Sequence, residues 1–135
     1  TNVKLLAVVE RVTDAVEIYK HVQNYLGEIT DDWGCFLFLY HGRIADQLRP
    51  ELYKQLKERD SNNQPYVIIT TSAIEVGCDL NAEVLISEIC PPENLIQRAG
   101  RCNRKGNIIN AKIIIIGDSI ADFANSLDES GWQQY

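Results

Sequence analysis

Two short stretches of the chain carry side chains that could act on phosphate groups. The later one, Gln97–Arg104, reads Q-R-A-G-R-C-N-R. Arg101 and Arg104 are three residues apart, so on a helical turn their guanidinium groups would point the same way. Because arginine stays charged and offers a planar fork of donors, the pair could clamp a polyphosphate and neutralise charge on a γ-phosphate. The alternative is a solvated basic helix end stabilised by the helix dipole, and spacing alone favours that alternative.

The earlier stretch, Thr70–Leu80, reads T-T-S-A-I-E-V-G-C-D-L and starts at the end of a predicted strand. Asp79 follows Gly77 closely, and a carboxylate in such a loop can accept hydrogen bonds from ribose hydroxyls. It could equally close the loop as an Asx-turn. The hydroxyls of Thr71 and Ser72 could contact a sugar–phosphate backbone, although hydroxyls at a strand end more often satisfy loop amides.

Three other polar residues favour structural roles. Arg98 lies on a different helix face from the arginine pair and is predicted to form a structural ion pair. Glu75 is predicted to be a surface carboxylate. His41 ends a predicted strand before Gly42 and Arg43 and has no partner acid or nucleophile at catalytic spacing, so we predict a hydrogen-bonded structural histidine.

The elements that would position these residues follow from apolar patterning. Apolar runs predict five strands, at Val3–Val9, Cys35–Tyr40, Tyr66–Thr70, Glu83–Ser87 and Ala111–Ile116. Helical spacing predicts one helix from an N-cap at Thr13 to Gly27, one over Asp46–Arg59 with Leu48, Leu52 and Leu56 as its apolar stripe, and one over Pro92–Arg101, with Asp60–Pro65 as a polar loop. Strands that alternate with helices indicate an α/β fold with a mainly parallel sheet and helices on both faces. In such a sheet, functional residues gather after the carboxyl ends of the strands.

Composition bounds the class of protein. With 135 residues, 45% of them hydrophobic, the chain fits one globular domain, and no apolar run approaches the ~20 residues that span a bilayer. The net charge of −6 argues against a stand-alone DNA-coating protein, but not against DNA contact through hydroxyls and amides. The four cysteines lack zinc-site spacing, so we predict no metal site and free, mostly buried thiols in a reducing cytoplasm.

The boundaries of the domain are also predicted. Residues 1–118 would form the domain, and residues 119–135 a short helix over Ser119–Leu127 and a tail that leads out of it. The chain starts with Thr1 rather than Met, so we expect a piece of a longer protein.

The text from Ile69 to Gly106 resembles a known family of motor proteins. Motif V of superfamily 2 helicases is matched by Thr71, Gly77 and Asp79, and motif VI by Gln97, Gly100, Arg101 and Arg104. The linking text, E-V-G-x-D, L-I-S-E-x-x-P and L-I-Q-R-A-G-R-x-N-R, closely resembles the CRISPR-associated helicase–nucleases of type I interference. Upstream, L-Y-H-G-R, which contains His41 and Arg43, resembles motif IVa more loosely.

This resemblance implies a RecA-like three-layer sandwich that serves as the second motor domain of an ATP-driven translocase. The family moves along single-stranded DNA using ATP, feeds that strand to a metal-dependent nuclease domain, and is recruited by a crRNA-guided surveillance complex. The residues implied for ATP are Gly77, Asp79 and Gln97, with Arg101 and Arg104 as arginine fingers, and those implied for the DNA backbone are Thr71, Ser72, His41 and Arg43.

The sequence also departs from the family's complete motor. Glu10 and Arg11 stand where the family commonly has Asn-Thr in motif IV, so we do not expect a backbone contact there. No G-x-x-x-x-G-K-[ST] occurs, Asp128 and Glu129 follow no strand, and there is no His-Asp dipeptide. The groups that hold the phosphates and Mg²⁺ are therefore expected in the first RecA-like domain of the same protein, and this chain alone is predicted to be inactive.

Two alternatives stay open. The chain could be the C-terminal domain of another superfamily 2 translocase, from repair or restriction. It could also be a non-catalytic binding module that kept the fold, although the intact arginines of Q-R-A-G-R-C-N-R argue against that interpretation.

Overall fold

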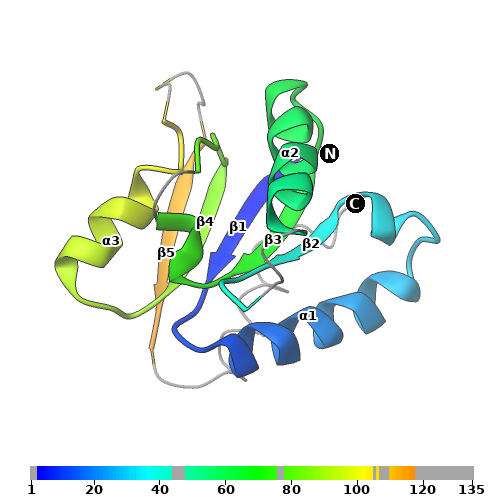
Figure 1. Ribbon diagram of the computed structural model, residues 1–135, viewed down its shortest axis with the longest axis horizontal. Coiled ribbons are helices and arrows are strands. Elements are labelled where there is room, and N and C mark those ends of the chain that lie inside the picture. The colour runs from blue at the N-terminus through cyan, green and yellow to red at the C-terminus, as the bar shows by residue number, and fades with distance from the viewer. Residues whose placement is uncertain (1–2, 44–47, 76–77, 105, 107–109, 118–135) are drawn as a thin grey trace.

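Five parallel strands form one sheet in the order β2-β3-β1-β4-β5 (Figure 1). The computed structural model describes residues 3–43, 48–75, 78–104, 106 and 110–117, so the predicted tail at 119–135 lies outside the described residues. The strands are β1 (Lys4–Val8), β2 (Leu37–Tyr40), β3 (Tyr66–Thr70), β4 (Val84–Glu88) and β5 (Lys112–Ile116). The predicted parallel sheet is confirmed, and its central strand, β1, is buried along its whole length.

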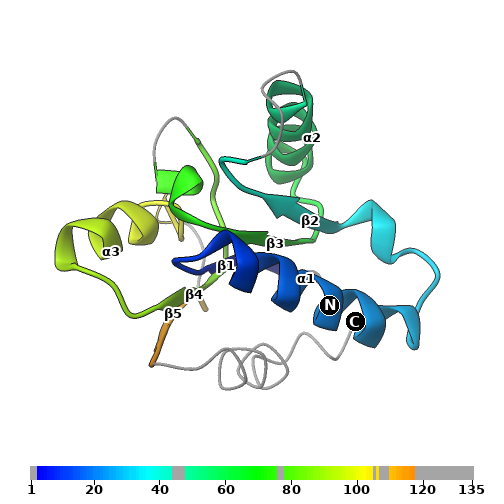
Figure 2. The ribbon, with the colours of Figure 1, turned by 60° about the horizontal axis from the view of Figure 1, so that its bottom comes forward.

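Helices cover both faces of the sheet. α1 (Val12–Gly27) lies on one face, and α2 (Arg49–Ser61) lies on the other together with the short 3-10 turn η2 (Ser72–Glu75) (Figure 2). α3 (Pro92–Ala99) packs against η2 and β4. A second 3-10 turn, η1 (Trp33–Cys35), occupies the start of the second predicted strand, so β2 begins later than expected. None of the described helices is long and apolar enough to cross a membrane.

Alternation along the strands divides the core in two. Leu5 and Ala7 of β1 pack towards α1, whereas Leu6 and Val8 pack towards α2. We call the two clusters the α1-side core and the α2-side core. The α1-side core contains Ala15, Ile18, Val22 and Leu26, which recur every three or four residues on the buried face of α1.

The predicted start of α1 is wrong by two residues. The helix begins at Val12, and its N-cap is Arg11, in extended conformation with φ −110° and ψ 137°, not Thr13. The Arg11 carbonyl accepts the first helical hydrogen bond, from Ala15 N at 3.0 Å, and the Arg11 side chain makes no capping hydrogen bond.

The apolar stripe predicted for α2 is wrong in part. Leu56 is fully buried, but Leu52 is only half-buried, and Leu48 precedes the helix and is 63% exposed. The helix also continues through Asp60, which was predicted to begin a polar loop but is only 5% exposed. α2 therefore meets the sheet through its C-terminal half, where it buries an acid.

Asp60 is held by polar groups near the start of β1 and β3. Lys4 Nζ lies 3.3 Å from Asp60 Oδ1 and donates to Asp60 O at 2.9 Å. The Tyr66 hydroxyl donates to Asp60 Oδ1 at 2.7 Å, and Asn81 N donates to the two carboxylate oxygens at 3.1 and 3.2 Å. Burial, reinforced by the Asp60 carboxylate, raises the pKa of Tyr66 far above its usual range. These contacts offset the cost of burying the carboxylate and the ammonium group.

We expect Asp60→Asn to lower the free energy of unfolding by about 3 kcal/mol, because the Lys4 ammonium group would stay buried without its counter-ion. Urea denaturation followed by circular dichroism measures the change. Lys54→Met, at an exposed position of the same helix, is the matched control and should change the free energy of unfolding by less than about 0.5 kcal/mol. Equal effects of the two variants would contradict the structural role of Asp60.

Candidate functional site

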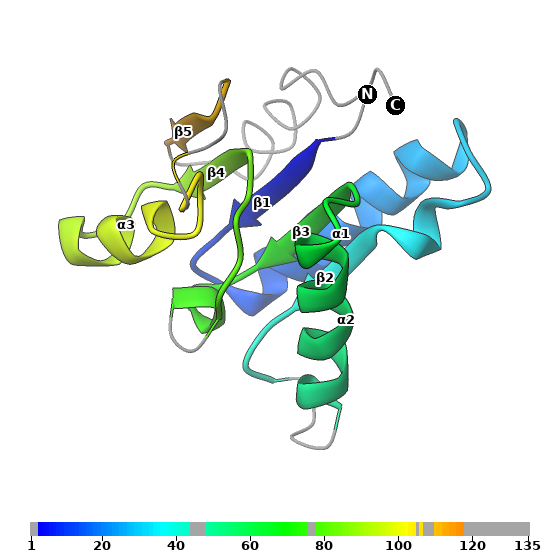
Figure 3. The same ribbon diagram turned by 90° about the horizontal axis from the view of Figure 1, so that it is seen from above.

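Two chain segments on the α2 side of the sheet lie next to each other and bring candidate residues together. One runs from η2 back to β4, and the other follows α3; Figure 3 shows η2 between α3 and α2. Ala82 and Cys102 form a parallel bridge between the segments, with Ala82 N donating to Arg101 O at 2.8 Å. Asn103 has a φ of 48°, a left-handed conformation that asparagine tolerates well, and it turns the chain just before Arg104.

Asp79 and Arg104 meet on this surface. Arg104 Nη1 lies 3.0 Å from Asp79 Oδ1, and the two side chains are 47% and 61% exposed. Lys57 of α2 approaches the other carboxylate oxygen at 3.1 Å. Asp79 thus lies beside α2, and Arg104 reaches it through the ion pair. Exposed ion pairs are weak, so Asp79 and Arg104 could give up their mutual ion pair for contacts with a ligand at little cost in free energy.

Arg101 contacts η2 rather than Asp79. α3 ends at Ala99, so the prediction that Arg101 and Arg104 share a helical turn and a direction is wrong. Arg101 Nε donates to Ile74 O at 3.2 Å, and its Nη2 donates to Glu75 O at 2.8 Å. These bonds use two of the five guanidinium donors and hold the half-buried Arg101 side chain against η2.

Arg98 is fully buried and makes the ion pair that was predicted for it. Its Nε donates to Glu75 Oε2 at 2.9 Å, and its Nη2 donates to Glu10 Oε1 at 2.8 Å. Its Nη1 donates to Ser87 Oγ, at the end of β4, at 3.0 Å. Burial by itself would lower the pKa of Arg98, but the hydrogen bonds to Glu75 and Glu10 outweigh burial and raise that pKa above its ordinary value. Arg98 is therefore a permanent buried cation.

The surface position predicted for Glu75 is wrong. The residue is 7% exposed, and its second carboxylate oxygen accepts a hydrogen bond from Asn94 Nδ2 at 2.9 Å. Glu10 is the more exposed partner of Arg98, at 44%. Its backbone N–H donates to Glu88 Oε1 at 2.8 Å, so the segment after β1 is tied to the end of β4.

The residues predicted for DNA follow the ends of two neighbouring strands. His41 follows β2 and Thr71 follows β3, and these strands pair to their last residues. The His41 and Thr71 side chains are buried, whereas Ser72 and Arg43 are exposed. His41 Nδ1 accepts a hydrogen bond from Arg43 N at 3.1 Å, which matches a structural histidine. Burial, assisted by the charge of Arg43, lowers the pKa of His41, so its ring is neutral at pH 7.

Of the two remaining residues predicted for ATP, the structure describes only Gln97. Gln97 is exposed on α3, next to the buried Arg98, so its amide can reach a partner outside the domain. Gly77 lies outside the described residues.

The described cysteines agree with the thiol prediction. Cys78, Cys90 and Cys102 are free, and Cys78 and Cys102 are buried. Burial raises the pKa of both buried thiols, so at neutral pH they are protonated and act as small apolar side chains.

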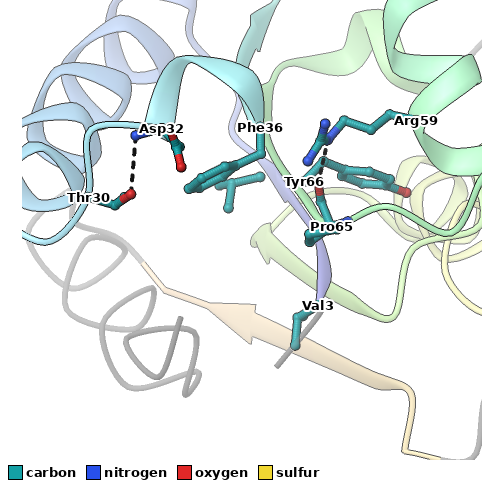
Figure 4. A pocket seen from close by; sticks show the side chains of 8 residues that line it. Val3, Thr30, Asp32, Phe36, Arg59, Pro65 and Tyr66 are labelled. Carbon is teal, nitrogen blue, oxygen red and sulfur yellow. Dashed lines mark hydrogen bonds between the residues drawn. The ribbon is translucent and has the colours of Figure 1, made fainter.

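A cavity of about 530 Å³ opens at the amino end of the strands (Figure 4). Its lining includes Val3, Phe36 and Tyr66, which lie at or just before the starts of β1, β2 and β3. Arg59 borders it and donates from Nε to Pro65 O at 2.6 Å. None of the described residues predicted for ATP or DNA lines this cavity, so it is separate from the surface of Asp79 and Arg104.

Sequence reasoning missed two residues that contact the Asp79 segment. The Tyr53 hydroxyl accepts a hydrogen bond from Asp79 N at 2.8 Å, and Lys57 Nζ donates to Asp79 O at 2.7 Å. The signal that could have found them is their spacing with Asp60, since residues three and four apart share a helix face.

Solved structures define the class of the fold. The crystal structure of T. fusca Cas3 with ATP matches with a TM-score of 0.74 over 87% of this chain and 15% of that chain, at 22% identity. A structure described as a CRISPR RNA-guided surveillance complex, pre-nicking, matches with a TM-score of 0.67 over 86% of this chain and 15% of that chain, at 24% identity. The chain is therefore a RecA-like α/β domain, as predicted.

Sequence comparison identifies the family. The chain belongs to the family described as CRISPR-associated nuclease/helicase Cas3, C-terminal, whose model matches residues 1–107. A putative CRISPR-associated nuclease/helicase Cas3 from Methanocaldococcus jannaschii is 39% identical over 106 residues, which are 76% of this chain and 13% of the relative. The chain thus corresponds to the helicase C-terminal domain and spans only a small part of the relative's length.

The Arg98 network predicts that its two acids differ in importance for stability. We expect Glu75→Gln to lower the free energy of unfolding by about 3 kcal/mol, because it removes the buried counter-ion of a buried cation. Glu10→Gln should cost less than about 1 kcal/mol, because that carboxylate is 44% exposed and screened by water. Urea denaturation of the two variants measures both values, and equal losses would contradict the network as described.

Proposed function

We propose that this domain is the second motor domain of an ATP-dependent DNA helicase that acts in type I CRISPR antiviral defence. The observation that supports this most directly is the exposed pair of Asp79 and Arg104, 3.0 Å apart. A carboxylate suits ribose hydroxyls and a guanidinium suits phosphate oxygens, so the two side chains together could address two parts of one nucleotide. Membership of the Cas3 family supports the same role.

Each of the four described residues assigned to ATP has a distinct proposed role. Asp79 accepts hydrogen bonds from the ribose, and Arg104 leaves Asp79 to stabilise charge on the γ-phosphate. Arg101 acts as the second finger with the donors that Ile74 and Glu75 do not occupy. Gln97 approaches the γ-phosphate from its exposed position on α3.

The residues present fit ATP only in part. ATP supplies the phosphoanhydride bond whose hydrolysis drives movement. Asp79 and Arg104 offer groups for its sugar and its terminal phosphate, but within the described residues no cluster of three or more acidic, histidine or cysteine side chains could hold a metal ion. The first RecA-like domain of the same protein would hold Mg²⁺ and the triphosphate chain, and closure of the two domains would complete the site. On this proposal the domain alone hydrolyses no ATP.

The proposed path for single-stranded DNA crosses the ends of β2 and β3. The exposed Ser72 and Arg43 would contact the sugar–phosphate backbone, and the buried Thr71 and His41 would shape the turns that present them. The likeness to a surveillance-complex structure supports recruitment by a crRNA-guided complex.

In the full-length protein, Arg104→Ala should lower the kcat of DNA-stimulated ATP hydrolysis by roughly 10³-fold, the effect of losing an arginine finger. A phosphate-release assay with saturating single-stranded DNA measures this rate. Lys20→Ala, which removes an exposed cation from α1 on the opposite face of the sheet, should leave the rate unchanged. Wild-type kcat in the Arg104 variant would overturn the finger assignment.

The DNA assignment predicts a salt-dependent effect. Arg43→Gln should weaken binding of a single-stranded oligonucleotide and reduce the slope of log K against log salt concentration by about 0.7, the value for one lost phosphate contact. Fluorescence anisotropy at several salt concentrations gives both slopes. An unchanged slope would place Arg43 outside the DNA path.

A further inference from the structure

Three polar side chains of α2 hold the chain segment that carries Asp79. Tyr53, Lys57 and Asp60 are spaced four and three residues apart, so they share one face of the helix. All three contact the segment Asp79–Asn81. We call this set the α2 ladder.

The α2 ladder acts mainly on the main chain of the segment. Asp79 N donates to the Tyr53 hydroxyl at 2.8 Å, and Lys57 Nζ donates to Asp79 O at 2.7 Å. Two residues on, Asn81 N donates to the Asp60 carboxylate at 3.1 and 3.2 Å. The amide and the carbonyl of Asp79 are thus both fixed by side chains from one helix, which sets the direction in which its own side chain leaves the backbone.

The α2 ladder is itself firmly anchored. The Tyr53 ring packs against the α2-side core. Asp60 is 5% exposed and forms the buried ion pair with Lys4 at 3.3 Å. Because these anchors belong to the folded core, the Asp79 segment is held by a rigid support, whereas the Asp79 carboxylate, at 61% exposed, faces solvent.

We propose that Tyr53 and Lys57 are positioning residues that aim the Asp79 carboxylate at the sugar of a bound nucleoside triphosphate. This inference rests on the ribose contact of the proposed function. It assigns the sugar preference of the motor to a helix outside motifs V and VI. Tyr53 acts through the amide of Asp79, and Lys57 acts through the carbonyl and through the nearer carboxylate oxygen at 3.1 Å.

Tyr53→Phe in the full-length protein tests the proposal, because it keeps the ring in the core and removes only the acceptor of Asp79 N. The measurement is the ratio of kcat/KM for ATP to kcat/KM for 2′,3′-dideoxy-ATP in DNA-stimulated hydrolysis. We expect Tyr53→Phe to lower this ratio about fivefold through KM for ATP, the size expected for one misplaced hydrogen bond. General destabilisation would not change the ratio, since both nucleotides share the same folded enzyme.

Matched control variants test whether the effect is specific to Tyr53 and Lys57. Tyr19→Phe, which removes a tyrosine hydroxyl from the α1 side, should keep the wild-type ratio. Lys57→Met should lower the ratio, whereas Lys54→Met, at an exposed position of the same helix, should not. Asp79→Asn sets the scale, because it damages the ribose contact directly.

The outcomes are distinguishable. If Asp79→Asn lowers the ratio while Tyr53→Phe and Lys57→Met keep the wild-type value, the positioning role is wrong and the ribose contact stands. If Asp79→Asn also keeps the wild-type ratio, the ribose contact of the proposed function fails, and the positioning role fails with it. A ratio lowered in Asp79→Asn, Tyr53→Phe and Lys57→Met, but in neither control, supports both.

Discussion

The buried guanidinium of Arg98 is the interaction that joins η2, α3 and the sheet beside the candidate site. It reaches Glu75 in η2 at 2.9 Å, Glu10 after β1 at 2.8 Å and Ser87 at the end of β4 at 3.0 Å. A cation removed from water costs several kcal/mol unless partners compensate it, and the buried Glu75 is the partner that matters most. Arg98 thus connects η2, α3 and the sheet. The carbonyl groups of η2 in turn hold the Arg101 side chain.

The two faces of the sheet use different means of specifying structure. The α1-side core is a cluster of apolar side chains, which tolerates small shifts because dispersion contacts have little direction. The α2 side contains two buried charge clusters in addition to its apolar core, one around Asp60 and one around Arg98. Hydrogen bonds to charged groups are directional and costly to leave unmade. The face that carries the candidate residues Asp79 and Arg104 is thus the face with buried ions.

The sequence predicts the sheet and α1 well because local pattern decides them. Buried strands are apolar runs, and the buried face of α1 repeats at helical spacing. The buried acids could not be predicted, because each depends on a partner far along the chain: Lys4 is 56 residues from Asp60, and Arg98 is 23 from Glu75. Without a partner visible in the sequence, an acidic residue is expected at the surface.

The candidate site shows the same limit. The motif residues could be named from their text, but the meeting of Asp79 and Arg104 depends on the bridge between Ala82 and Cys102, which no local pattern encodes. The direction of Arg101 was mispredicted because its helix was extended past Ala99. Types and spacing therefore named the candidate residues, while long-range pairing decided where their side chains point.

The early end of α3 separates three arginines that share one spacing. On a continuous helix, Arg98, Arg101 and Arg104 would lie on neighbouring faces and compete for the same partners. Instead the helix ends at Ala99 and the left-handed Asn103 redirects the chain, so Arg98 is buried, Arg101 is half-buried, and Arg104 is 47% exposed. The three arginines thus range from a buried structural ion to an exposed surface charge. Arg104 can change partner without disturbing the core, which suits the phosphate contact proposed for it.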